Sequence, residues 1–306
     1  MKMWKIYALL TTVMFIWGFN LPLLKYLLLY VDPVTMTAFR ILLASVSVFI
    51  ILSGFKLIRM PTKNEWLYIV GGALLNVVLH HYFLNMGLSR TTGTNAGLIL
   101  GTGPVLTVIS VSLILRNYPS KIQWVGVLLG VIGVSSVVLA GGGGIAGLAL
   151  GDLFVFIAIL AQVLSFLIIS KAAKTIDPRL LTAYMMLIGS AMLFIISLIQ
   201  EPGEIKAFAT VPPMFWLGFA ASGIIGTAVG HMLYNYSVGK VGPSKAAIFI
   251  NFNTMFSLLG SVLFLGEIIT IRHLLGLIFI IAGVILGSGA AEDLWKKRRL
   301  QNEKIT

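Results

Sequence analysis

Residues 32–40, Asp-Pro-Val-Thr-Met-Thr-Ala-Phe-Arg, return in altered form at residues 177–185, Asp-Pro-Arg-Leu-Leu-Thr-Ala-Tyr-Met, 145 positions later. A second set of matches has a spacing of 150 and pairs Trp66, His81, Asn85 and Arg90 with Trp216, His231, Asn235 and Lys240. An insertion of about five residues explains the change of spacing, and such self-similarity indicates an internal duplication. We therefore predict two similar halves, residues 1–145 and 146–290, followed by a basic tail at 291–306.

The composition places both halves in a lipid bilayer. Of the 306 residues, 58% are apolar and only 10% are charged, whereas soluble domains carry about 25% charged residues. This excludes a soluble enzyme and a disordered chain. The chain has no cysteine, which excludes a disulfide-built secreted domain and thiolate metal sites.

Ten apolar runs are each long enough for a helix that crosses a bilayer, which needs about 20 residues. The first run, from Trp4 to Tyr30, is too long for a signal peptide, and we expect it to be the first span. The predicted spans are 5–29, 34–54, 66–88, 92–115, 122–140, 152–172, 179–199, 214–237, 244–265 and 273–290.

The basic residues predict the orientation. With the N-terminus in the cytoplasm, 17 of the 22 Lys and Arg residues face the cytoplasm, four face outward, and Arg40 lies within a span. We therefore expect a multi-pass protein of the cell membrane with both termini in the cytoplasm. The net charge of +12 is scattered between spans, apart from the run 296–299, so we expect no nucleic-acid partner.

Five spans in each half require the second half to be inverted relative to the first. Inverted repeats are typical of transporters, whose substrate site lies near the midplane between the halves. Duplication also builds scaffolds, but the inverted geometry favours transport.

The first half opens with Phe15-Ile16-Trp17-Gly18-Phe19-Asn20, followed by Pro33 and by Ala38-Phe39-Arg40 in the second span. The second half opens with Gly151-Asp152 and ends its ninth span with Leu265-Gly266-Glu267. Taken together over all ten spans, they make the chain similar to the EamA branch of the drug/metabolite transporter superfamily. One departure is that the first half has Arg116-Asn117 where the second has Gly266-Glu267. The resemblance therefore does not imply that Glu267 has a counterpart with the same role in the first half.

The resemblance implies a carrier with a central cavity lined by spans 1–4 and 6–9, and with spans 5 and 10 as peripheral packing helices or a homodimer interface. Members of the family move amino acids, amines, vitamins, sugars, nucleotide-linked metabolites and drugs. The glycines of spans 5 and 10 suit close helix packing in their own right; they are Gly126, Gly130, Gly133, Gly276, Gly283 and Gly287.

The polar side chains inside the spans are neutral or weakly basic. All ten acidic residues fall in loops or at span ends, which argues against a proton relay through membrane carboxylates. His81 with Asn85, and His231 with Asn235, each share a helix face. We expect these pairs at the outer and inner mouths of one cavity as gates, or else as interhelical hydrogen bonds.

Further candidates for substrate binding lie near mid-depth. Thr102 precedes Pro104, which removes a backbone donor, and the matching part of span 9 holds Asn251 and Asn253. These two asparagines suit a zwitterion or an amide, or a helix–helix bond. The other candidates are Asn76 and His80 on span 3, Trp17 and Asn20 on span 1, Gln162 on span 6 and Tyr234 on span 8.

Arg40 lies seven residues inside span 2. It either snorkels outward, forms a structural pair, or binds an anionic group such as a substrate carboxylate. The run Gly141 to Gly144 lacks the Lys-Ser/Thr of a phosphate loop, and we expect it to connect the halves.

These features predict a secondary transporter of small polar or amphipathic metabolites that works by alternating access, with an amino acid or related amine exported. The alternative is a facilitator or an importer of a vitamin or nucleotide-like solute. A membrane enzyme is disfavoured because the intramembrane histidines have no carboxylate partners in the spans and no His-Glu-x-x-His pattern occurs. The loops leave no room for a soluble sensor domain. We expect no cofactor and no metal.

Overall fold

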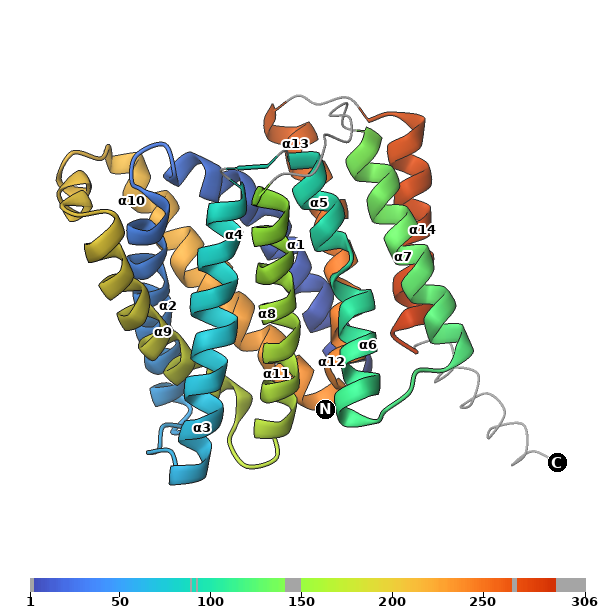
Figure 1. Ribbon diagram of the computed structural model, residues 1–306, viewed down its shortest axis with the longest axis horizontal. Coiled ribbons are helices and arrows are strands. Elements are labelled where there is room, and N and C mark those ends of the chain that lie inside the picture. Colours follow the sequence, from blue (N-terminus) through green and yellow to red (C-terminus); the bar gives the residue numbers. More distant parts are fainter. Residues whose placement is uncertain (1–2, 89, 92, 141–149, 266–268, 290–306) are drawn as a thin grey trace.

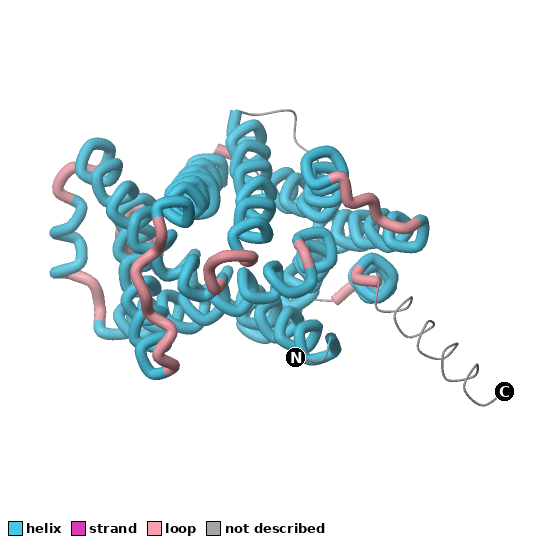
Figure 2. Tube along the Cα trace, turned by 90° about the horizontal axis from the view of Figure 1, so that it is seen from below, coloured by secondary structure: helices cyan, strands magenta, loops and turns pink. Residues whose placement is uncertain are grey.

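The computed structural model describes residues 3–88, 90–91, 93–140, 150–265 and 269–289. Within these ranges the chain consists of helices and loops, and no strand occurs (Figures 1 and 2). The first half contains α1 (Met3–Leu27), α2 (Pro33–Gly54), α3 (Lys63–Gly72), η1 (Ala73–Leu79), α4 (His80–Leu88), α5 (Gly93–Gly101), α6 (Gly103–Leu115) and α7 (Lys121–Ala140). The second half contains α8 (Leu150–Ala172), α9 (Pro178–Gln200), η2 (Glu204–Ala209), α10 (Pro213–Ala220), η3 (Ala221–Val229), α11 (Gly230–Val241), α12 (Pro243–Ala247), η4 (Ile248–Ile250), α13 (Asn251–Leu265) and α14 (Ile271–Gly287).

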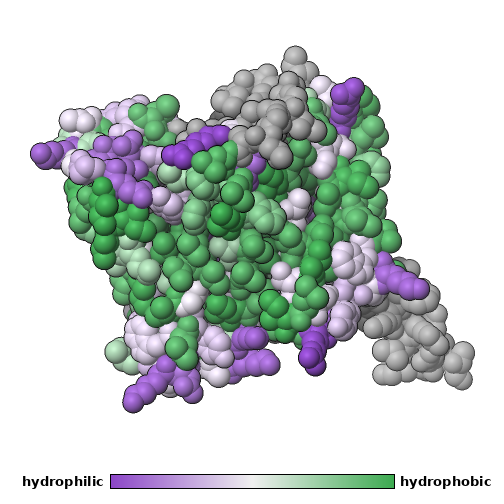
Figure 3. All heavy atoms as spheres, in the orientation of Figure 1, coloured by the Kyte–Doolittle hydropathy of each residue, from purple (hydrophilic) through white to green (hydrophobic). Residues whose placement is uncertain are grey.

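Seven continuous helical stretches are long and apolar enough to cross a membrane. The shorter helix α14 is apolar as well, and α1 and α13 are helical where the sequence predicts spans 1 and 9. Side chains on the face shown in Figure 3 form a broad apolar band with hydrophilic residues gathered above and below it. The prediction of an all-helical, multi-pass membrane protein is therefore confirmed. The seven stretches are Pro33–Gly54, Lys63–Gly87, Ala96–Leu115, Lys121–Ala140, Leu150–Ala172, Pro178–Gln200 and Pro213–Val241.

The duplicated Asp-Pro motif starts α2 and α9, which pack against each other. Proline suits the first helical position because its fixed φ matches the helix and its missing N–H has no partner there anyway. Asp177 caps α9 by accepting a hydrogen bond from the Arg179 N–H at 2.9 Å. At α2 the cap comes from the other half, because the Glu201 carboxylate accepts the N–H groups of Val34 and Thr35 at 3.1 and 2.7 Å.

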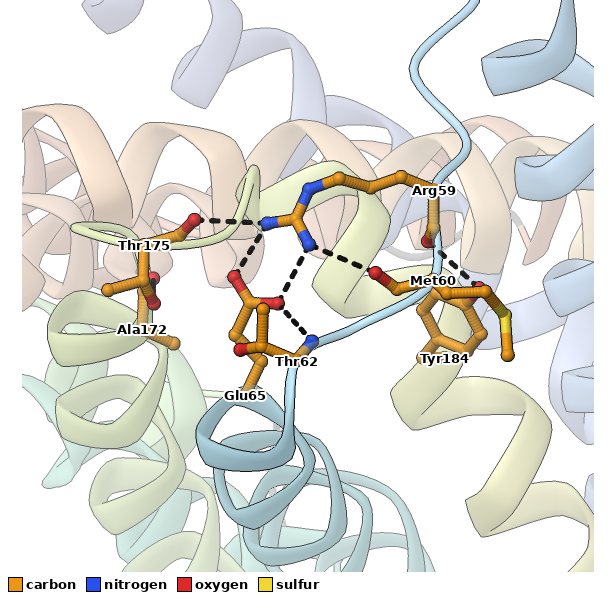
Figure 4. Close-up of polar contacts among 7 residues, drawn as sticks. All are labelled: Arg59, Met60, Thr62, Glu65, Ala172, Thr175 and Tyr184. Carbon is orange, nitrogen blue, oxygen red and sulfur yellow. Dashed lines mark hydrogen bonds and ion pairs between the residues drawn. The ribbon is translucent and has the colours of Figure 1, made fainter.

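A polar network joins the two halves at the opposite end of the α2–α9 pair (Figure 4). The Arg59 guanidinium makes an ion pair with Glu65 at 2.6 Å and donates to the Thr175 carbonyl at 3.1 Å. Glu65 also accepts the Thr62 N–H at 2.7 Å, which completes a capping box at the start of α3. The Tyr184 hydroxyl of α9 donates to the Arg59 carbonyl at 3.1 Å. The α2–α3 connection is thereby tied to the start of the second half.

Helices α7 and α14 pack at backbone distance, as their glycines predict. A Cβ on Gly133 would lie 2.7 Å from the Gly276 carbonyl oxygen, and one on Gly283 would lie 2.6 Å from the Gly130 nitrogen. Only glycine permits such an approach. These glycine faces are occupied within the chain, so a homodimer through the two helices would use their other faces.

The connections α2–α3, α6–α7, α8–α9 and α11–α12 lie at one end of the bundle, the lower end in Figure 1, where α1 also begins and α14 ends. These connections and the adjoining helix turns carry Lys56, Arg59, Lys63, Arg116, Lys121, Lys171, Lys174, Arg179, Lys240 and Lys245. Three predicted features lie outside the described residues: the glycine connector at 141–144, the Gly266-Glu267 motif and the basic tail at 291–306.

Candidate functional site

Two π-helical segments mark the middle of the bundle. The segment η1 occupies residues 73–79, and η3 occupies 221–229, which overlaps the position 150 residues later. In each half the π-helical turns end directly before the histidine region, at His80 and at Gly230. Wider turns of this kind are frequent at functional sites. Neither segment was predictable from the sequence, because a π-helix has no distinct apolar periodicity.

Trp17 of α1 connects the first half to the second. Its indole Nε1 donates to the Gly226 carbonyl at 2.9 Å, and its ring lies 4.9 Å from the His231 ring and 5.2 Å from the Tyr234 ring. The approach depends on Gly230, where a Cβ would lie 2.5 Å from Nε1. One part of the site is therefore an aromatic contact between α1 and α11.

The three central histidines come together across the halves. The rings of His81 and His231 lie 6.0 Å apart, and those of His80 and His81 lie 4.9 Å apart. His80 Nδ1 is 3.0 Å from the Ala158 carbonyl, and its Nε2 is 3.2 Å from Gln162 Nε2. We name Trp17, His80, His81, Gln162, His231 and Tyr234 the central cluster.

This differs from the expectation that His81 and His231 lie at opposite mouths of a cavity. Side chains of a helix tilt toward its N-terminus. Because α4 and α11 belong to halves predicted to run in opposite directions, both imidazoles tilt from their own side toward the middle. The two rings therefore meet.

The asparagines of the two predicted gate pairs make interhelical hydrogen bonds. Asn85 donates to Thr37 at 3.1 Å, and Asn235 donates to Thr182 at 3.0 Å. Both partners belong to the duplicated motif, so the same bond occurs in each half. For the asparagines, this geometry is that of the alternative to gating, interhelical hydrogen bonds that link α4 to α2 and α11 to α9.

Arg40 does not snorkel outward. Its side chain is 4% exposed, and its Nη1 donates to the hydroxyl of Thr227 in η3. The Thr227 hydroxyl in turn donates to the Ser222 carbonyl at 2.9 Å. Thr227 precedes His231 by four residues, about one helical turn, so both lie on the same side of this stretch. Arg40 therefore joins the central cluster. Thr227 is a site residue that the sequence did not single out, since the matching residue of the first half is Val77.

The remaining candidates lie at different distances from the cluster. Asn20 lies against Gly226, where a Cβ would be 2.7 Å from its Cγ. Asn76 donates to Ser165 at 2.8 Å, and the Ser165 hydroxyl donates to the Gln162 carbonyl at 2.6 Å. Both therefore adjoin the cluster, Asn20 next to η3 and Asn76 next to α8.

The helical geometry of span 4 is irregular next to Pro104, as predicted, and span 9 contains the 3₁₀ turn η4 directly before Asn251. Thr102 separates α5 from α6, and its hydroxyl donates to the Ile99 carbonyl at 2.6 Å. The amide of Asn251 packs against Gly130 of α7. Asn253 lies about 200° further around the same helix. The structure therefore does not bring the two asparagines together, and it places Asn251 on the peripheral side.

An all-helical membrane bundle with polar and aromatic side chains of both halves at its centre is the arrangement found in multi-pass membrane transporters. The model of the EamA-like transporter family matches residues 4–139 and again residues 149–289. The chain belongs to this family.

The chain aligns with its relatives over nearly its whole length. The chain is 28% identical to the uncharacterized transporter YyaM of Bacillus subtilis, with 94% of this chain and 95% of the relative aligned. It is 26% identical to the uncharacterized transporter YvbV of the same organism, with 91% and 90% aligned. One solved crystal structure matches 96% of this chain and 99% of its own with a TM-score of 0.79 at 18% identity, which shows the fold alone.

Proposed function

We propose that the protein is a secondary carrier that moves small polar or amphipathic metabolites by alternating access, with its substrate site at the central cluster. The observation that carries this proposal is the meeting of Trp17 and His81 from the first half with His231 from the second. A site shared by two halves is exposed to either side as the halves move against each other. Buried polar atoms without a hydrogen-bond partner in the described structure also occur here, on Asn20 and Tyr234.

The proposed architecture is ten spans in two inverted five-helix repeats. Its support is the pairing of corresponding helices, since α2 packs on α9 and α7 packs on α14. A two-fold axis in the membrane plane places the helices beside the axis against their counterparts in this way. The basic connections at the lower end of the bundle support termini in the cytoplasm and a location in the cell membrane.

For the cargo, we propose an amino acid or related amine that is exported. The neutral, hydrogen-bonding and aromatic groups of the central cluster suit a small amphipathic solute. Import or facilitated diffusion of a vitamin or nucleotide-like solute is the alternative. In either case the protein acts as a carrier rather than an enzyme and needs no cofactor.

The polar networks indicate which helices move together. Glu201 ties α9 to the start of α2, and Arg59 ties the α2–α3 connection to Thr175 at the other end. We therefore expect the α2–α9 pair to stay together during transport. The contacts that change during transport would then be those of α1 with α11 and of α4 with α8, which surround the cluster.

The test is counterflow in proteoliposomes loaded with unlabelled amino acids and supplied with labelled ones. Trp17→Phe removes the bond to Gly226, and His231→Ala removes a central ring. The chain offers matched controls in Trp216→Phe and His273→Ala, because Trp216 is 47% exposed and His273 lies at the start of α14.

We expect saturable counterflow in the wild type and in both controls, and at least a tenfold loss in the two cluster variants. Equal counterflow in all four variants would refute the site. The absence of movement of any solute by correctly folded wild type, including vitamins and nucleotides, would refute the carrier.

A further inference from the structure

Arg40 is a buried cation in the membrane interior. It lies on α2 with 4% of its surface exposed, and it reaches Thr227 near the middle of the stretch Pro213–Val241. A charge in such a place is costly unless it is paired, and an ionisable residue inside the membrane usually marks a functional pathway.

The described part of the chain supplies no counter-charge to Arg40. The two ion pairs recorded there join Arg59 to Glu65 and Arg179 to Asp177, and both lie at the lower end of the bundle. The histidines of the central cluster, His80, His81 and His231, carry no negative charge whether they are protonated or neutral. The centre of the bundle is therefore electropositive.

The guanidinium also has unused donors. Thr227 is its hydrogen-bond partner among the described residues, through Nη1, and the buried Nε–H has none. Because the Thr227 hydroxyl gives its own proton to the Ser222 carbonyl, its lone pairs are available to hold Nη1 in place. The edge of the planar guanidinium that does not contact Thr227 has N–H groups spaced to match the two oxygens of a carboxylate.

Arg40 and the aromatic part of the cluster bond to neighbouring residues of η3. The Trp17 indole bonds to Gly226, the residue next to Thr227, and His231 lies one helical turn beyond Thr227 on the same face. A solute bound through its carboxylate at Arg40 thus has the partly buried Trp17 ring within reach of its uncharged portion.

We propose that Arg40 binds the carboxylate of the transported solute, so that the protein selects carboxylate-bearing solutes and rejects their amides and decarboxylated amines. This inference rests on the proposed function and narrows it, because simple amines are removed from the cargo. Until a solute binds, Arg40 is held by neutral partners, and the solute's carboxylate supplies the missing charge.

The test uses a uniformly ¹³C-labelled metabolite extract offered to proteoliposomes, with the accumulated solutes identified by mass spectrometry against empty liposomes. We expect every solute enriched by the wild type to carry a carboxylate. For one such solute, the amide and the decarboxylated amine are then compared as competitors, and neither should inhibit. Enrichment of amines that lack a carboxylate would overturn this inference and leave the carrier standing. No enrichment at all would overturn the proposed function.

Variants then localise the selectivity. Arg40→Gln should raise KM for the carboxylate solute at least about 30-fold, the effect of losing one partner of a buried charge pair. Arg40→Lys keeps the positive charge but lacks the planar guanidinium, so we expect a smaller increase in KM than for Arg40→Gln. Arg90→Gln is the matched control, because the exposed Arg90 lies over the Phe154 ring outside the cluster. Unchanged KM in Arg40→Gln overturns the inference. Should that variant not fold, the wild-type selectivity and Arg40→Lys still decide it.

Discussion

The contact between α7 and α14 makes a sharp prediction for Gly126→Ala. A Cβ at this position would lie 2.1 Å from the Gly287 nitrogen and 2.6 Å from its Cα. Carbon atoms in ordinary contact lie about 3.5–4.0 Å apart. One helix must therefore withdraw by about 1 Å or more. The atoms that are met belong to the backbone, so rotation of a side chain cannot relieve the overlap.

The magnitude follows from two opposing terms. Alanine favours a helix over glycine by about 1 kcal/mol, whereas overpacking of a filled interface costs about 1–3 kcal/mol. Because the overlap is with backbone atoms that cannot rotate away, we expect the upper half of the resulting range, a net loss of about 1–2 kcal/mol, which corresponds to a fall in Tm of about 2–8 °C.

The assay is thermal unfolding of the detergent-solubilised protein. Gly54→Ala is the matched control, because Gly54 also lies in a helix but a Cβ added to it would have nothing within 4 Å. Its Tm should equal or exceed that of the wild type. If Gly126→Ala melts at or above the wild type while the control behaves as expected, the two helices do not meet at backbone distance and the reasoning fails.

Three further predictions concern the polar contacts. Asn85→Ala and Asn235→Ala should each lower stability by about 0.6–2 kcal/mol and leave the KM of the folded carrier unchanged; a changed KM at unaltered Tm would favour the gating role. Burial and the carboxylates of Glu204 and Glu201 raise the pKa of Asp32, so the folded protein is destabilised by this charge at neutral pH. Asp32→Asn should therefore raise Tm at pH 7, with the difference vanishing below about pH 4, where the carboxyl is protonated in both states; a lower Tm at pH 7 would contradict this. Glu201→Ala should cost about 0.5–2 kcal/mol by uncapping α2, and a Tm equal to that of the wild type would show that the cap contributes nothing.

Much of the fold was predictable because it depends on local or repeated patterns. Apolar runs of sufficient length specify helices in lipid, since a backbone in hydrocarbon must satisfy its own hydrogen bonds. The Asp-Pro motifs begin α2 and α9 where the sequence predicts, and the glycines of α7 and α14 meet. The family assignment, drawn from motifs spread over the chain, is confirmed by the match to both halves.

The site was only partly predictable. Polarity and helical spacing selected Trp17, His81, His231 and Arg40, but they did not show which of these residues face one another. Asn251 was selected for the same reasons and lies against Gly130, away from the cluster. The same polar side chain inside a span suits either role, so its type does not distinguish substrate binding from a bond between helices.

The sequence alone determined that the chain lies in a lipid bilayer, that it contains a duplication, and where its helices are. Each of these depends on residues close in the chain or on a fixed repeat. The tertiary structure decided the π-helical segments, the meeting of His81 with His231 and the bond from Arg40 to Thr227, a residue 187 positions away. These contacts depend on the tilt and rotation of whole helices. Both are set by the sum of many packing contacts along the bundle, so no single stretch of sequence records them.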